Sequence, residues 1–388
     1  MWGAMRFRST GVALGMAAVG LVGAGIVHCG LRSLPPPPQA TPTRVGLVGG
    51  AVLSVPAGAI DRAGLIASFK ELSFKTIILQ AAADEGGQLV SDRVALAMEL
   101  QRELDADVYI GTYQAPALNG APMDRLVQND AAFSACYRPD GVLLDANASL
   151  IDKLRLCSQN TAELIAEALR TANASPRIGC YITHQPELVE KLTDEERTKL
   201  ASFFRDAAAA CHKADRQVAI SPRLSPRSGD PDGAGLVFRE LLRDSGINLV
   251  ILQDSVGSFD AGSSRHAALY YQGLRNALAD RQAPFGPVKI WANVEAFDCE
   301  PPACAKAHPT STLRFTEQLC GARARVDGIV TDDYLRDLAG KPLYTPTTDA
   351  SADASADAQG VIDDTDASAQ LRRGYLEWRD AGAPCPAR

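Results

Sequence analysis

The feature that most constrains the fold is a repeated alternation of short β-rich segments with longer helical segments. Eight segments have the apolar composition and period-two pattern of strands, at 45–53, 75–80, 107–114, 177–183, 217–221, 247–253, 288–295 and 328–331. Helical spacing recurs between them, and such a series is typical of an α/β protein built as a single (β/α)8 TIM barrel. The structural alternative is a doubly wound open sheet. No glycine-rich phosphate-binding turn follows the first segment, so nucleotide binding has little support and the barrel is favoured.

Composition supports a large folded body without a nucleic-acid surface. The chain has 388 residues, of which 46% are hydrophobic and 22% are charged, as in globular proteins. Its net charge of −7 and the lack of a Lys/Arg block argue against binding to nucleic acid. We expect no nucleic-acid partner, and we expect a monomer.

The first residues have the pattern of an export signal. Arg6 and Arg8 precede an apolar run at 11–27, and Cys29 follows. Residues 1–29 are therefore predicted to be a lipoprotein signal, a cleaved signal peptide or an uncleaved anchor, and residues 30–44 a proline-rich linker. Each alternative predicts an exported protein, in the periplasm, on the outer membrane or outside the cell. We expect membrane contact only through this segment or through a lipid on Cys29.

The cysteines are predicted to form disulfides. Eight follow Cys29, and an even number in an oxidising compartment favours pairing. Cys180 with Cys211 and Cys136 with Cys157 are plausible local pairs. The alternative is a zinc site, whose ligands would be Cys299, Cys304, His308 and Cys320. The spacing of these residues matches no zinc-finger pattern, and we expect no metal and no other cofactor.

The C-terminal part interrupts the alternation. The barrel is predicted to occupy residues 45–344. The Asp-Ala-Ser repeats at 345–369 have too little apolar content to order themselves, which predicts a disordered acidic segment. Residues 370–388 are predicted to form a helix that docks on the barrel through Tyr375 and Trp378, with Cys385 as a possible tether.

The segment 288–297 carries polar side chains on one face of a strand. Val288, Ile290, Ala292 and Val294 alternate with Lys289, Trp291, Asn293 and Glu295. The first face suits packing against helices. A buried core would not tolerate the second face unpaired, which predicts that Trp291, Asn293 and Glu295 point into a binding cleft. The alternative is an edge strand whose outer face carries a mixture of polar and apolar side chains.

Barrel ligands bind at the C-terminal ends of the strands, so candidate residues can be assigned from those positions. The ends are rich in amides, carboxylates and rings, which suits an oligo- or polysaccharide. Predicted substrate-binding residues are Gln80, Tyr113, Tyr181, Gln185, Gln253, Trp291, Asn293, Asp332 and Tyr334. Hydrolysis of a glycosidic bond needs two carboxyl groups, and the predicted catalytic residues are Glu295, Glu187 and Asp254.

Six ordered segments resemble a family of exported bacterial barrels that is grouped with glycoside hydrolases by fold. They are Gly179-Cys-Tyr-Ile182, Ile220-Ser-Pro222, Leu252-Gln-Asp-Ser-Val-Gly257, Tyr270-Tyr-Gln272, Trp291-Ala-Asn-Val-Glu-Ala-Phe297 and Asp327-Gly-Ile-Val-Thr-Asp-Asp-Tyr334. The resemblance implies a glycosidase-like barrel in which Glu295 is the nucleophile or base. The family's glutamate four residues after Tyr181 is Gln185 here, and Gln185 cannot transfer a proton. Two hypotheses therefore stay open: a glycoside hydrolase, or a non-catalytic polysaccharide-binding or envelope protein.

Overall fold

The structure is a computed structural model of the 388-residue chain. It describes residues 47–53, 60–80, 87–112, 149–183, 187–188, 191–224, 229–257, 264–300, 307–332, 334–343 and 365–385. The chain divides into a unit of residues 1–43 and a unit of residues 44–388, and all of the described residues belong to the second unit. The predicted export signal and the proline-rich linker lie outside the described residues.

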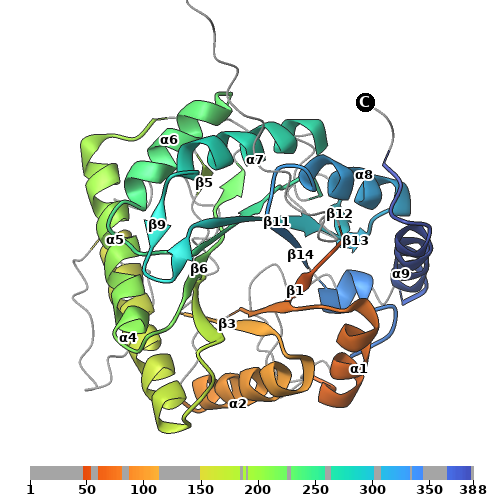
Figure 1. The fold of residues 1–388 in the computed structure, drawn as a ribbon, viewed down its shortest axis with the longest axis horizontal. Helices are drawn as coiled ribbons and strands as arrows, with labels where there is room; N and C mark the ends of the chain where they lie inside the picture. The colour runs from red at the N-terminus through yellow and green to blue at the C-terminus, as the bar shows by residue number, and fades with distance from the viewer. Residues whose placement is uncertain are drawn as a thin grey trace, which may run out of the picture. The chain divides into compact units, whose positions relative to one another are not determined.

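Eight parallel strands close into a barrel, which confirms the predicted fold (Figure 1). In spatial order each strand pairs with the next, and the last returns to β11. The strands in this order are β11 (Lys289–Glu295), β14 (Gly328–Asp332), β1 (Gly50–Leu53), β2 (Thr76–Leu79), β3 (Asp107–Gly111), β4 (Ile178–Ile182), β6 (Val218–Ile220) and β8 (Leu249–Gln253). Each falls within or overlaps one of the eight predicted segments.

Helices surround the strands (Figure 1). They are α1 (Arg62–Leu72), α2 (Gly87–Leu104), α4 (Leu150–Thr171), α5 (Asp194–His212), α6 (Pro231–Leu241), α7 (Ser264–Leu278) and α8 (Thr312–Ala322). A capping box formed by Thr193 and Glu196 begins α5, and it satisfies backbone N–H groups that the helix leaves unpaired. None of the helices in the described part of the chain combines the length and hydrophobicity needed to cross a bilayer.

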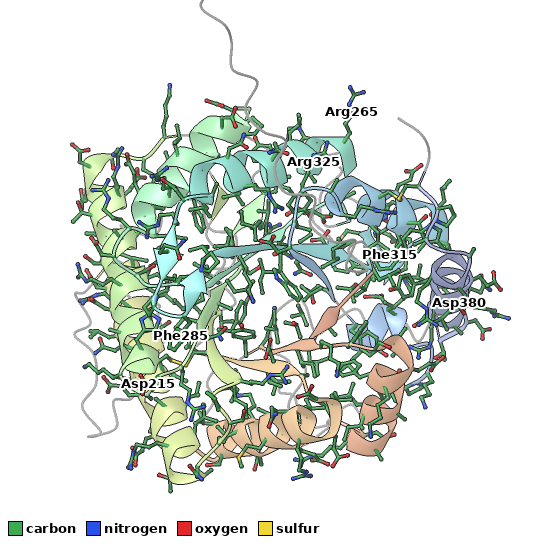
Figure 2. All side chains as sticks on the ribbon, in the orientation of Figure 1. Asp215, Arg265, Phe285, Phe315, Arg325 and Asp380 are labelled. Atoms are coloured by element: carbon green, nitrogen blue, oxygen red, sulfur yellow. A yellow bond between two sulfur atoms is a disulfide. The ribbon has the colours of Figure 1, made fainter. Side chains whose placement is uncertain are left out.

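Side-chain alternation along the strands produces two separate cores. One lies between strands and helices and includes Ile290, Ala292 and Val294 of β11. The other fills the barrel, and it is formed by Val52, Ile78, Tyr109, Tyr181, Ala219, Leu249, Ile251 and Val330, with Trp291 packed against it. All eight barrel strands thus contribute to the interior, as the period of two requires. The charged side chains of Asp215, Arg265 and Asp380 lie on the outside of the helices (Figure 2).

Short strands extend the connections at both ends of the barrel. β5 (Glu187–Leu188) pairs with β7 (Arg223–Leu224), and β7 pairs with the end of β8. After β11, the chain forms a small antiparallel ladder of β12 (Phe297–Cys299) and β13 (Ala307–Pro309). A second ladder, β9 (Gln282–Ala283) with β10 (Gly286–Pro287), precedes β11.

Disulfides join strands and helices. The predicted pair Cys180–Cys211 is confirmed, and it links β4 to α5 because Cys180 lies on the helix-facing side of its strand. A second disulfide joins Cys320 to Cys385. Cys157 and Cys299 are disulfide-bonded too, whereas Cys136 lies outside the described residues. With Cys299 and Cys320 in disulfides, the zinc alternative is wrong, because a thiolate ligand cannot also be a disulfide sulfur.

The C-terminal helix α9 (Thr365–Asp380) packs against α8 and the π-helical turn η3 (Tyr334–Leu338). It begins at Thr365 rather than at residue 370, and buried Ser368 accepts a hydrogen bond from the Gly340 N–H. The Tyr375 hydroxyl accepts a hydrogen bond from Val48 N at 3.1 Å, which ties the helix to the start of β1. Residues 345–364 of the predicted acidic segment lie outside the described residues.

Two adjacent glycines provide a test of the packing at the start of β1. A Cβ at Gly50 would lie 1.9 Å from the backbone oxygen of Thr76, whereas one at Gly49 would lie 3.6 Å from the Ile329 oxygen. Gly50→Ala should therefore lower the free energy of unfolding by roughly 2–3 kcal/mol, because the strand has to move. Gly49→Ala is the matched control and should stay within about 0.5 kcal/mol of wild type. Urea unfolding measures both, and equal values would contradict this packing.

Candidate functional site

Three neighbouring strands bring predicted site residues to the same end of the barrel. Glu295, Asp332 and Gln253 are the last residues of β11, β14 and β8. Glu295 is in register with Asp332, and Asn293 with Gln253. Because parallel strands end at the same edge, the strand pairing itself gathers these side chains.

The Glu295 carboxylate is fully buried at this edge and accepts hydrogen bonds from neighbouring groups of the protein. Its Oε1 accepts from Gln253 Nε2 at 3.2 Å, and its Oε2 accepts from the backbone N–H of Gly257 at 2.7 Å. A Cβ at position 257 would lie 2.0 Å from the Phe297 oxygen and 3.1 Å from Glu295 Oε2. Only glycine therefore allows this loop to approach the carboxylate.

Asp254, the first residue after β8, is a second buried carboxyl group next to Glu295. Its Oδ2 accepts from Gln318 Nε2 at 2.8 Å, and its Oδ1 accepts from Val256 N at 3.3 Å. Burial, and then the Glu295 carboxylate, raise the pKa of Asp254 to about 7. Asp254 can therefore keep its proton near neutral pH.

The loop that carries Asp254 has an unusual backbone conformation. Ser255 has a φ of 54°, in the left-handed region that a residue with a side chain seldom adopts. Its side chain is almost fully buried, and the same loop places the Gly257 N–H on Glu295. Such conformations persist where the surrounding structure enforces them, and they are frequent at functional sites.

Two buried side-chain oxygens face the barrel interior without a hydrogen-bond partner among the described residues, namely Gln253 Oε1 and Asn293 Oδ1. Gln253 and Asn293 are 8% and 2% exposed. A buried acceptor that lacks a donor is costly, so these atoms are suited to receive hydrogen bonds from a ligand hydroxyl or from ordered water.

Two predicted aromatic residues, Trp291 and Tyr181, pack with the core that fills the barrel. Trp291 points into the barrel interior, lies earlier in β11 than Glu295, and covers Gly328 at the start of β14 with its ring. Tyr181 is 1% exposed and belongs to the same interior core. Both side chains pack mainly against aliphatic residues of this interior core, as barrel-filling side chains do.

The predicted residue Tyr334 is buried outside the barrel interior. Its hydroxyl lies 2.6 Å from Ser68 Oγ and accepts a hydrogen bond from Arg372 at 3.1 Å. Its ring packs on Phe69 and Phe74, in the core between strands and helices. The π-helical turn η3 begins at Tyr334, soon after the end of β14, and the Tyr334 side chain lies in this core instead of in the barrel interior.

The remaining predicted residues are described only in part. Gln80 directly follows β2 and is partly buried. The backbone of Glu187 lies in β5, in register with Arg223, but its side chain is outside the described residues, as are Tyr113 and Gln185 entirely.

Three side chains at the site were not predicted from sequence: Tyr271 of α7 and Arg314 and Gln318 of α8. Tyr271 is 1% exposed, and burial together with the Asp254 and Glu295 carboxylates raises its pKa well above the ordinary value. The Arg314 guanidinium lowers the pKa of Asp254, against the larger effect of burial. The sequence did contain one signal that could have revealed this contact: the polar Gln318 lies beside Phe315 and Leu319 on the apolar side of a helix.

Among the described residues, no group of three or more potential metal ligands comes together.

The raised pKa of Asp254 predicts how stability depends on pH. The folded protein binds this proton more tightly than the unfolded chain, in which an Asp titrates near about 3.9. The stabilisation is complete below about pH 4, and it is lost as pH rises to about 7. Asp254→Asn should remove this decline, which is on the order of a few kcal/mol.

Urea unfolding between pH 4.5 and 8 measures this effect as the difference between the variant and wild type. Asp244→Asn, at an exposed carboxylate, is the matched control and should run parallel to wild type. A parallel curve for Asp254→Asn as well would contradict the raised pKa.

Comparisons with solved structures show likeness in fold alone. A GH5_18 protein from Streptomyces cattleya in complex with GlcNAc is 12% identical, with 88% of this chain and 82% of that chain covered and a TM-score of 0.45. The exo-beta-1,4-mannosidase Op5Man5 from Opitutaceae bacterium strain TAV5 is 12% identical, with 88% and 61% covered and a TM-score of 0.47. A D-allulose 3-epimerase from Methylomonas sp. is 11% identical, with 86% and 97% covered and a TM-score of 0.44.

No curated protein matches the sequence. One family model does match, and it is described as a domain of unknown function, DUF4434. The match runs over residues 63–344, from the first turn of α1 to just past η3, and so spans most of the barrel and both carboxyl groups. The chain therefore belongs to the DUF4434 family.

Proposed function

We propose that this protein is an exported glycoside hydrolase that acts on an extracellular or envelope polysaccharide. The observation that carries the proposal is the buried carboxyl pair of Asp254 and Glu295 at the C-terminal ends of adjacent strands. Glycoside hydrolysis needs one carboxyl group that holds a proton and one that is ionised. A carboxyl group with a pKa of about 7 beside a second carboxylate fits the first role.

In the proposed mechanism, Asp254 gives its proton to the glycosidic oxygen as the bond to the anomeric carbon breaks. Glu295 then acts at the anomeric carbon, either directly as nucleophile or as the base that activates water. The unpartnered oxygens of Gln253 and Asn293 support the proposal, because a sugar hydroxyl would supply the donor that each of them lacks. The disulfides support export, because they form in oxidising compartments. Glu187 is kept as the alternative acid.

A second candidate function is non-catalytic binding of polysaccharide. The observation that favours it is the hydrogen bonding of the carboxyl pair: all four oxygens of Asp254 and Glu295 accept hydrogen bonds from the protein itself. Both residues are almost fully buried, as in a network that holds a loop in place. Such a protein would bind a sugar chain beside the pair without cleaving it.

Substitution of the pair tests the first function. Glu295→Gln should abolish release of reducing ends from a panel of neutral and amino-sugar polysaccharides. Asp254→Asn should lower turnover by about 10²–10⁴-fold, because the proton donor is lost. Glu300→Gln, at an exposed carboxylate just beyond β12, is the matched control and should keep wild-type turnover.

The outcomes separate the two functions. Unchanged turnover in Glu295→Gln contradicts the hydrolase. If the wild-type protein binds a polysaccharide in a pull-down or by calorimetry, releases no reducing ends, and Glu295→Gln binds equally well, the binding function is supported instead.

A further inference from the structure

Two side chains one turn apart on α8 connect the end of β11 to Asp254. Arg314 and Gln318 are four residues apart and therefore share a face of the helix. Gln318 is 2% exposed, and its Nε2 donates to Asp254 Oδ2 at 2.8 Å. Gln318 is thus a buried amide whose hydrogen bond ends on the carboxyl group proposed to carry the proton.

Arg314 determines which way the Gln318 amide is oriented. Its Nη1 donates to Gln318 Oε1 at 2.5 Å. A guanidinium has donors only, so the amide oxygen has to face Arg314 and the amide NH2 has to face Asp254. In the reverse orientation the Gln318 NH2 group would face the Arg314 N–H, and Asp254 Oδ2 would lose its hydrogen-bond donor.

Arg314 is itself fixed by the segment that follows Glu295. Its Nη2 donates to the backbone oxygens of Glu295, at 3.0 Å, and of Phe297, and its Nε forms an ion pair with Asp298 at 2.8 Å. The orientation of Gln318 is therefore coupled to the backbone that carries the other carboxylate of the pair.

We propose that Gln318, oriented by Arg314, is a positioning residue that keeps Asp254 Oδ2 a hydrogen-bond acceptor and so directs the Asp254 proton away from the helix. The inference deepens the proposed hydrolase, and it depends on that function only for the effect on turnover. The hydrogen bond itself is independent of any activity.

The groups that face Asp254 come from three elements. Burial, and then Glu295 of β11, favour the protonated form of Asp254, whereas Gln318 and Arg314 of α8 favour the carboxylate. Tyr271 of α7 is buried beside the pair, with its pKa raised by both carboxylates. Val256 N, in the same loop as Asp254, also favours the carboxylate. Loss of the Gln318 donor should therefore raise the pKa of Asp254 further.

The test is the pH dependence of unfolding in Gln318→Met, which keeps the size of the side chain and removes its donor. In wild type, the raised pKa of Asp254 should make stability fall as the pH rises to about 7. The stability midpoint is defined as the pH at which this fall ends, which equals the pKa of Asp254 in the folded protein. In Gln318→Met, the stability midpoint should move upward by about one pH unit. Gln272→Met, the same change at an exposed position of α7, is the matched control and should leave the stability midpoint unchanged.

The Asp254→Asn background shows whether the shift belongs to Asp254. There Gln318→Met should produce no change in pH dependence. A midpoint that does not move in the single variant, or a shift that persists in the double variant, overturns the inference. If Gln318→Met does not fold at pH 5 by circular dichroism, Gln318→Leu replaces it. Gln318→Leu also removes the donor to Asp254 without adding a titrating group, and it should shift the pH dependence of unfolding in the same direction.

Turnover gives a second readout that separates the inference from the proposed function. If the protein hydrolyses a polysaccharide, the alkaline limb of its kcat/KM profile should move upward with the stability midpoint. If Glu295→Gln leaves turnover unchanged, the hydrolase proposal fails, and the stability measurements still decide the role of Gln318.

Discussion

The pairing of β11 with β8 on one side and β14 on the other is the interaction on which the rest of the structure depends. It closes the barrel, and it gathers Gln253, Glu295 and Asp332 at one edge. Parallel strands have a fixed register, so a shift of β11 by one residue would turn its polar face toward the helices and its apolar face inward. Closure of the fold and formation of the carboxyl pair are consequently the same event.

Burial then gives this edge its chemical character. In water, Asp254 and Glu295 would both be ionised at neutral pH and would interact weakly. In the folded protein both carboxyl groups are buried, and hydrogen-bond donors reach them from Gln253, Gly257, Val256 and Gln318. These donors compensate part of the cost of burying charge, and the repulsion that remains favours retention of a proton.

Much of the fold follows from patterns local in sequence, but the site follows only in part. The period-two alternation predicted all eight strands. It also placed Glu295 at a strand end. The alternation could not predict where the Tyr334 side chain points, because that depends on the turn after β14. It also could not show how deep in the barrel the Trp291 side chain lies. Tyr271, Arg314 and Gln318 reach the carboxyl pair from helices, and reading strand ends does not detect such contacts.

The disulfide between Cys320 and Cys385 has a topological consequence. It spans 65 residues, and that span includes the acidic Asp-Ala-Ser repeats as well as α9. The chain between the two cysteines is therefore a covalent ring. A protease that cuts one peptide bond within the ring opens it without releasing a fragment, and the C-terminal helix stays attached to α8 until the bond is reduced.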